Sequence, residues 1–338
     1  MNAGKLIGVA AAAATAAGVA AYSRYRSEIT DIRKKVERGS EIASTAVGPI
    51  EYAEAGKGQP LLLIHGAGGG YDQGLLIGRD FGKGLRIIAP SRFGYLRTPV
   101  PEDFSPAAQA DAHAALLDHL GIEKAIVAGV SAGGPSAVEI ALRHPDRVTA
   151  LILLVPRTFD PTQSIGVDES MQSQAVLRLI ESSADFLYWV AMRVARSAVV
   201  RFLGVPPQVE ASASGEDRAR VTAVMRSVLP LSGRVRGIAV DSGIELSQWP
   251  LERLHVPTLI VSAKDDLFKT LPGAIFTAEH IHGSELRVLE SGGHLMVGQS
   301  KQVSDWVTNF LRRHAAHDRK PSARRKDQTV EKVLEPVS

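Results

Sequence analysis

Apolar runs alternate with amphipathic stretches along most of this chain. Near-continuous runs of aliphatic residues predict buried strands at 60–66, 85–91, 124–131, 148–156, 256–266 and 285–294, and a shorter alternating pattern precedes them at 44–56. Such runs are typical of parallel strands that are covered on both faces. Helical patterns at 106–121 and 135–148 separate some of them. This alternation predicts an α/β fold with a mostly parallel central sheet flanked by helices.

The alternation of strands and helices is interrupted between the predicted strands at 148–156 and 256–266. Residues 158–250 contain several helical patterns and no clear buried strand, so we expect a helical cap inserted into the fold. The core would then comprise 45–157 and 251–313. The charged segment at 314–338 contains Pro and Ser and is expected to be a disordered basic tail.

The first 44 residues are expected to form an apolar helix followed by a basic spacer. The run at 6–22 is uncharged, but nine of its residues are alanine, and a helix of that length spans only about 25 Å. Basic residues are concentrated after the run. The positive-inside rule therefore predicts a membrane anchor at 6–22 with a cytoplasmic catalytic domain. A cleaved signal peptide with export, or a soluble helix, are the alternatives.

The composition excludes some classes of function. The 338 residues include no cysteine, which excludes disulfides, thiolate metal sites and a cysteine nucleophile. The net charge is +3, and the excess of basic residues lies in the two flanks, at 24–38 and 311–338. A nucleic-acid enzyme would need a basic stripe on its folded body, so that class is set aside. Length and composition do not define the oligomeric state.

The segment "GVSAGG" at 129–134 carries the main candidate nucleophile. A Gly-x-Ser-x-Gly pattern follows a predicted buried strand and precedes a predicted helix, which is the context of a nucleophile elbow. Glycines on either side of Ser131 allow the chain to pack closely around the turn. Ser131 would then lie at a helix N-terminus, whose dipole favours developing negative charge.

A serine hydroxyl needs a general base, and the base needs a carboxylate that orients it. The order Ser, Asp, His is satisfied by "SAKDD", at the end of one predicted strand, and by "SGGH", after the next. His294 is the predicted base. Asp265 is the predicted acid, with Asp266 as its alternative and Asp160 as a more remote one.

The oxyanion of acyl transfer needs two N–H donors. One is expected from Ala132, which follows the nucleophile. The other is expected from the glycine-rich loop "HGAGGG" at 65–70, where Ala67 is the predicted donor and Gly68 the alternate. His65, in the same loop, is predicted to be structural.

Together these motifs resemble the α/β-hydrolase fold superfamily in its lidded, esterase-like branch. The resemblance is carried by "HGAGGG", "SRFGYLRTP", "LLDHLGIEKAIVAGVSAGGPSAVEIALRHPDRV", "SAKDD" and "SGGH", and it covers about residues 48–312. In many relatives "SRFGY" would begin with Asp, whereas Ser91 stands here. The resemblance implies a Ser-His-Asp triad, a helical cap and no cofactor or metal.

The default expectation is hydrolysis of a small or medium apolar carboxylic ester through an acyl-enzyme. Alternatives are a carbon–carbon bond hydrolase of the meta-cleavage type, a cofactor-free haloperoxidase-like activity, and a non-enzymatic ligand-binding module on the same fold. The cap supplies candidate pocket residues: Phe186, Tyr188, Trp189, Met192 and Phe202 for an apolar group, and Arg193, with Arg157 just before the cap, for a carboxylate.

Overall fold

The computed structural model describes residues 3–162 and 174–315, with side chains at 15–162 and 183–314. It contains an eight-stranded sheet in the order β1-β2-β4-β3-β5-β6-β7-β8. The strands are β1 (Glu41–Thr45), β2 (Gly48–Gly56), β3 (Gln59–Ile64), β4 (Leu85–Pro90), β5 (Ala125–Val130), β6 (Val148–Leu154), β7 (Thr258–Ala263) and β8 (Glu285–Leu289). The helices are α1 (Ala3–Arg38), α2 (Tyr71–Gly78), α3 (Pro106–His119), α4 (Gly134–Arg143), α5 (Gln174–Val194), α6 (Arg196–Phe202), α7 (Pro207–Ala211), α8 (Gly215–Ser227), α9 (Val235–Gly243), α10 (Leu271–His280) and α11 (Ser300–Ala315).

The sheet is parallel from β4 to β8 and antiparallel only at its β1–β2 edge. β3 pairs in parallel with both β4 and β5, and the parallel ladder continues through β6, β7 and β8. β2 joins β1 and β4 antiparallel. The predicted mostly parallel α/β fold is therefore confirmed. The carboxyl ends of the parallel strands meet at one edge, where loops from several strands converge.

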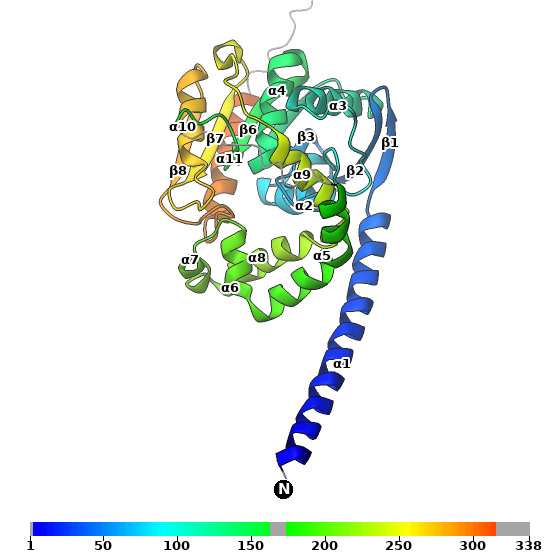
Figure 1. Ribbon diagram of the computed structural model, residues 1–338. Coiled ribbons are helices and arrows are strands. Elements are labelled where there is room, and N and C mark those ends of the chain that lie inside the picture. Colours follow the sequence, from blue (N-terminus) through cyan, green and yellow to red (C-terminus); the bar gives the residue numbers. More distant parts are fainter. Residues whose placement is uncertain (1–2, 163–173, 316–338) are drawn as a thin grey trace, which may run out of the picture.

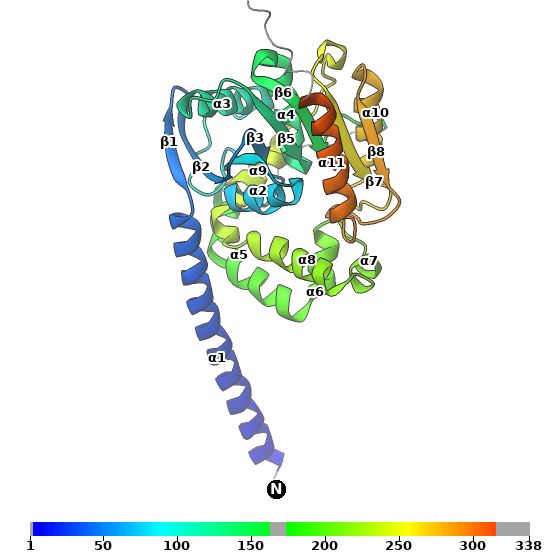
Figure 2. The same cartoon turned by 180° about the vertical axis from the view of Figure 1, so that it is seen from behind.

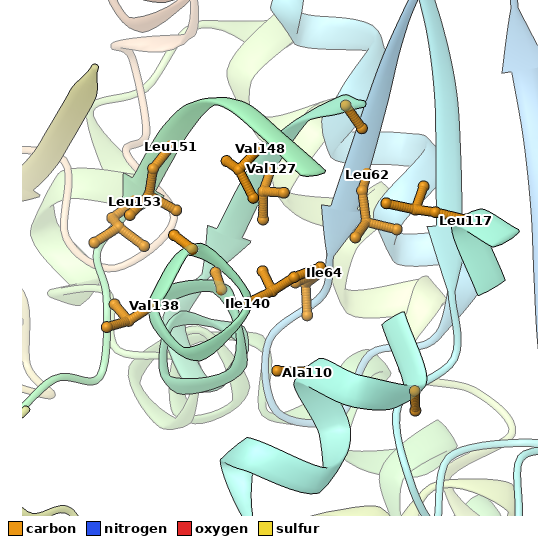
Figure 3. Packing of buried hydrophobic residues seen from close by; sticks show 14 of the residues in the cluster. Leu62, Ile64, Ala110, Leu117, Val127, Val138, Ile140, Val148, Leu151 and Leu153 are labelled. Atoms are coloured by element: carbon orange, nitrogen blue, oxygen red, sulfur yellow. The ribbon is translucent and has the colours of Figure 1, made fainter. Parts of the chain in front are cut away.

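Side chains of the central strands divide between two hydrophobic cores, one on each face of the sheet. On β3, Leu62 and Ile64 pack with α3, α4 and α10, whereas Leu61 and Leu63 pack with α11 and the loop before β4. Figure 3 shows the first of these cores, with Ile64 beside Ile140 of α4 and Val138 on the other side of the same helix. Because both faces are covered, the strands lack a polar side, which explains their continuous apolar sequence.

The helices α5 to α9 lie between β6 and β7 in the sequence and form a cap. Figures 1 and 2 show α5 to α8 gathered beside one edge of the sheet, with α1 running past them. The cap has its own core, which includes Trp189, Val200, Val221 and Met225. The predicted helical insertion is confirmed as part of the fold. Its segment at 163–173, like the predicted tail at 316–338, lies outside the described residues.

The second half of α1 packs against the cap rather than acting only as a spacer. Tyr25 and Ile29 are buried in the cap core, and burying an isoleucine contributes about 1.5–3 kcal/mol. Glu28 accepts hydrogen bonds from Trp189 Nε1 at 2.9 Å and from Arg193 at 2.6 Å. Burial raises the pKa of Glu28, but these bonds and one from Arg24 outweigh it and lower the pKa to about 2. Glu28 is therefore ionised at neutral pH.

The prediction of membrane attachment through residues 6–22 is wrong. α1 is a helix over this stretch, but none of the helices in the described part of the chain is both long and apolar enough to cross a bilayer. Its alanines explain the error, since they form helix readily and add little hydrophobicity. The predicted membrane-associated localisation depended on this anchor and is wrong for the same reason.

Candidate active site

Ser131 lies on a sharp turn between β5 and α4, at the carboxyl edge of the sheet. Its φ is +50°, a left-handed conformation that non-glycine residues adopt at a cost. A short 3₁₀ turn, Ser131–Gly133, links the strand to the helix. The backbone around the serine is therefore strained, as in a nucleophile elbow.

The two glycines of the Gly-x-Ser-x-Gly pattern are required by close packing. A Cβ on Gly129 would lie 2.6 Å from Cβ of Ala137, and a Cβ on Gly133 would lie 2.5 Å from the carbonyl oxygen of Ile64. Such distances are too short for any side chain. The glycines therefore allow α4 to begin directly against β5 and β3, which fixes the position of Ser131.

His294 and Asp266 form a buried pair after the last two strands of the sheet. His294 Nδ1 is 2.8 Å from Asp266 Oδ2, and both side chains are almost fully buried. Burial raises the pKa of Asp266, but hydrogen bonds from His294, Thr270 and the amide of Phe268 outweigh it and leave the pKa below its usual value. An ionised carboxylate accepts the Nδ1 proton, so Nε2 of His294 is left as the basic nitrogen.

Asp265, the predicted triad acid, hydrogen-bonds to the loop before His294 and not to the His294 ring, whose Nδ1 binds Asp266. Its Oδ1 accepts from the amide of Gly293 at 2.8 Å, and its Oδ2 accepts from Ser291 Oγ at 2.7 Å and the amide of Gly292 at 3.1 Å. The assignment is therefore corrected to the alternative, Asp266. The two aspartates are neighbours in the turn after β7, and their side chains point in different directions. Asp265 stabilises the loop before His294, and Asp266 binds the His294 ring.

The loop after β3 carries the predicted oxyanion donor. His65, Gly66, Gly68, Gly69 and Gly70 are buried, whereas Ala67 is exposed. The amide of Gly68 donates to Tyr95 Oη at 3.2 Å, so this alternate donor is already occupied. Within the described part of the chain no hydrogen bond to the amide of Ala67 is found.

His65 fixes the start of that loop, next to the end of β3. Its Nδ1 lies 2.7 Å from the carbonyl of Gly66, and its Nε2 accepts from the amide of Arg92 at 3.0 Å. Complete burial, followed by the nearby charge of Arg92, lowers its pKa well below the usual value. The ring is therefore neutral, and both of its nitrogens are used within the loop region.

A cavity of about 780 Å³ lies between the sheet edge and the cap, and Ser131, His294 and Ala67 all border it. Aliphatic side chains dominate its lining, including Ile77, Val224, Val228, Leu231, Val235 and Ile238. Of the predicted pocket aromatics, Tyr188 and Phe202 reach this cavity. Phe186 and Trp189 instead pack with Tyr25 of α1.

The other sequence candidates have structural partners. Arg193 pairs with Glu28, and Arg157 donates to the carbonyls of Asp241 and Ile244 at 3.0 and 2.8 Å. Asp160 accepts from Thr162 within its own loop. Met192 packs against the cap core. In the described residues there is no cluster of three or more His, Asp or Glu side chains arranged to hold a metal ion.

Gly204 of the cap is a site residue that sequence reasoning missed. Its carbonyl accepts from the amides of His294 at 3.0 Å and Leu267 at 3.1 Å, so it joins the cap to both the histidine loop and the acid loop. Its φ is +79°, and a Cβ there would lie 2.6 Å from Cβ of His294 and 2.7 Å from the ring of Phe268. The only sequence signal was a glycine between two helical patterns.

Gly204→Ala is therefore expected to displace His294. The added methyl should cost about 1–3 kcal/mol of stability through overpacking, and a displaced base should lower kcat by tenfold or more, since about 1 Å of misplacement can cost 10² in rate. The matched control is Gly283→Ala, where φ is +73° but a Cβ meets nothing within 4 Å. Steady-state kinetics and thermal melting of both variants check this. Equal effects of the two substitutions on kcat would contradict it.

Comparison with known proteins places the chain in a family. The sequence model described as alpha/beta hydrolase fold matches residues 59–300. The chain is 30% identical over 257 residues to the uncharacterized hydrolase YcgS of Bacillus subtilis, covering 74% of this chain and 89% of that one. It is 30% identical over 227 residues to a 2-hydroxymuconate semialdehyde hydrolase of Pseudomonas putida, covering 60% and 80%. A solved alpha/beta hydrolase fold protein from Nakamurella multipartita superposes with a TM-score of 0.61 at 30% identity, covering 81% of this chain and 99% of that one.

A parallel sheet with a serine elbow and a buried Asp–His pair at its carboxyl edge defines a hydrolase-type site. The chain belongs to the α/β-hydrolase fold family. This membership confirms the resemblance drawn from the sequence and the prediction that the protein is a hydrolase.

Proposed function

We propose that the protein is a serine hydrolase that cleaves small or medium apolar carboxylic esters through an acyl-enzyme. The observation that carries the proposal is one arrangement: Ser131, strained on its elbow, borders the same cavity as His294, whose Nδ1 is hydrogen-bonded to Asp266. An aligned carboxylate, imidazole and serine hydroxyl activate the nucleophile.

In the first half-reaction, Ser131 Oγ would attack the ester carbonyl carbon while its proton passes to His294 Nε2. The resulting oxyanion would be held by the amides of Ala67 and Ala132. As the carbon–oxygen bond to the alcohol breaks, His294 returns the proton to the leaving oxygen. Water then attacks the acyl-enzyme by the same route, and the acid product and free Ser131 are released.

The cavity supports an apolar acyl group. Its volume of about 780 Å³ is within the range of sites for small organic ligands. Aliphatic side chains from the cap, such as Val224 and Ile238, line it, and each buried methylene of a substrate chain would contribute about 0.8 kcal/mol to binding. The proposal therefore favours substrates with an aliphatic or aromatic acyl part over strongly polar ones.

The proposal is tested by labelling with a fluorophosphonate probe, followed by mass spectrometry of the modified peptide. We expect a covalent adduct on Ser131, together with turnover of p-nitrophenyl esters that rises from acetate to a medium acyl chain. Heat-denatured protein is the control, because the activated serine requires the folded site. Folded protein that neither labels nor turns over any of the esters would contradict the proposal.

A second candidate is a carbon–carbon bond hydrolase of the meta-cleavage type, which would use the same three residues on an acid-bearing substrate. The charge of the cavity favours it: Arg201, Arg220 and Lys269 line the cavity and no acidic residue does, among the described residues. Asp80 neutralises Arg220, and Arg201 and Lys269 remain at the exposed rim. The Pseudomonas putida relative is named for such a substrate. Faster turnover of a dienoate ring-fission acid than of any neutral ester would support this candidate over the first.

A further inference from the structure

The glycine-rich loop at 65–70 is held by side chains that come from outside it. Four of its six residues are glycine, so the loop has few side chains of its own with which to fix its shape. Glycine loses more conformational freedom on folding than any other residue. A loop of this composition needs external contacts if an amide within it is to point in one direction.

Tyr95 supplies one of these contacts and connects the loop to helix α9 of the cap. The buried Tyr95 hydroxyl accepts from the amide of Gly68 at 3.2 Å and donates to Asp241 Oδ2 of α9 at 2.5 Å. Gly237, also in α9, makes room for the ring, since a Cβ there would overlap it. Burial, followed by the charge of Asp241, raises the pKa of Tyr95 well above its ordinary value, so the hydroxyl keeps its proton.

Arg92 adds a second connection between the same helix and the loop. Its two terminal nitrogens bind Asp241 at 2.6 and 2.7 Å, and its Nε donates to the carbonyl of His65 at 2.9 Å. Arg92 and Asp241 are both buried. Hydrogen bonds in such a low-dielectric region are strong, and leaving one member unpaired is costly.

Arg234 provides a third contact from the residue that precedes α9. It is completely buried, and its Nη1 donates to the carbonyl of Gly69 at 2.5 Å. The guanidinium also pairs with Asp72, at 2.8 Å from Nη2 to Oδ2, and donates to the carbonyl of Leu229 at 3.1 Å. Arg234 therefore joins two segments of the core to the cap.

We infer that helix α9 of the cap positions the oxyanion loop, with Tyr95 and Arg234 as positioning residues. These contacts fix His65 and Gly68 on either side of Ala67, and Gly69 just beyond. Ala67 itself is exposed, and its amide donates no hydrogen bond within the described residues. The amide assigned to the oxyanion is thus aimed by groups that never touch the substrate. This inference rests on the proposed serine mechanism, because only that mechanism gives the Ala67 amide a role.

The test compares Tyr95→Phe and Arg234→Lys with the wild type. Phenylalanine keeps the ring and removes only the hydroxyl, and lysine keeps the buried charge but loses the fork that reaches Gly69. Tyr52→Phe is the matched control: this tyrosine is buried and donates to Glu41 at 3.1 Å, and it lies on β2, outside the site. For each protein we would measure kcat and KM on a p-nitrophenyl ester, the rate of phosphonylation by a fluorophosphonate, and the melting temperature.

Loss of a whole oxyanion donor costs about 10²–10³ in kcat, so loosening one should lower kcat and the phosphonylation rate by roughly 10- to 100-fold. KM should stay within about threefold, since the contacts act on the reacting oxygen and not on the acyl pocket. Tyr52→Phe should leave all three quantities near the wild type. Should one of the two site variants fail to fold, the other decides the matter by the same criteria.

Two results would overturn the inference. One is a folded variant whose kcat stays close to that of the wild type. The other is a higher KM with unchanged kcat, which would mean that the contacts only shape the pocket. In both cases labelling of the wild type leaves the proposed hydrolase function intact. A wild type that does not label at all contradicts that function instead.

Discussion

Replacing Ser131 with alanine is expected to lower ester turnover by at least about 10⁴-fold, because the residual rate then depends on the oxyanion donors and substrate binding alone. The alanine methyl group fits because it occupies the position of the serine Cβ and the substitution removes only the hydroxyl oxygen. Steady-state assays at high enzyme concentration measure the loss, and the fluorophosphonate adduct should disappear with it.

The matched control for this variant is Ser136→Ala. Ser136 is another serine of the same region, buried in the first turn of α4, where its hydroxyl donates to the carbonyl of Gly133 at 3.4 Å and lies 3.3 Å from His113 Nε2. Both contacts are long and neither reaches the cavity, so removing them should change kcat by no more than about threefold, which corresponds to less than 1 kcal/mol. If Ser131→Ala retained a hundredth or more of wild-type turnover, Ser131 would not be the nucleophile.

Asp266→Asn is expected to lower kcat by about 10⁴-fold while leaving KM nearly unchanged. The carboxylate accepts the Nδ1 proton of His294 at 2.8 Å and the hydroxyl proton of Thr270 at 2.6 Å. Both of these bonds end on Oδ2, and Oδ1 accepts from the amide of Phe268 at 2.9 Å. An asparagine has only one acceptor oxygen, so its NH2 group must face one of these donors, and its neutral amide no longer stabilises the imidazolium. The imidazole therefore loses the orientation and the tautomer that leave Nε2 free for the serine. Pre-steady-state kinetics of acyl-enzyme formation, with melting temperature as the stability check, measure this effect.

The neighbouring residue provides a sharp control for that experiment. Asp265→Asn removes the same charge one position earlier in the chain, at a carboxylate that binds the amides of Gly292 and Gly293 and never meets the imidazole. An asparagine oxygen can still accept from at least one of these amides, so we expect a loss in kcat below about tenfold. A larger loss from Asp265→Asn than from Asp266→Asn would reverse the assignment of the acid.

The cap contacts the loops of the candidate site from two sides as well as lining the cavity. Gly204 accepts from the histidine and acid loops, and Arg220 of α8 donates to the carbonyl of Leu295, next to His294. At the opposite side, Arg234 and Asp241 fix the loop after β3. Both halves of the proposed machinery are thus held by residues that follow β6 in the sequence by about fifty or more positions.

Local sequence was sufficient for the fold class and the elbow. The strand before Ser131, the helix after it and the two glycines lie within 20 residues, and their signals are periodicity and the steric freedom of glycine, both readable without tertiary contacts. The helical insertion was predictable for the same reason, because its patterns have the helical period and lack buried strand runs. His294 was predictable from its place on a glycine-rich loop after a strand.

What the sequence by itself determined is therefore the order of strands and helices, the position of Ser131 and His294, and the family. Only the tertiary structure decided which of two adjacent aspartates faces the imidazole. Both residues are aspartates, and they lie within one residue of the same distance along the chain from the histidine loop, so the sequence does not distinguish them. The packing of α1 on the cap and the hydrogen bonds that connect α9 to the loop at 65–70 were likewise decided by the tertiary structure. Pairs such as Glu28 with Trp189, and Tyr95 with Asp241, join residues 161 and 146 positions apart, and no local pattern records such contacts.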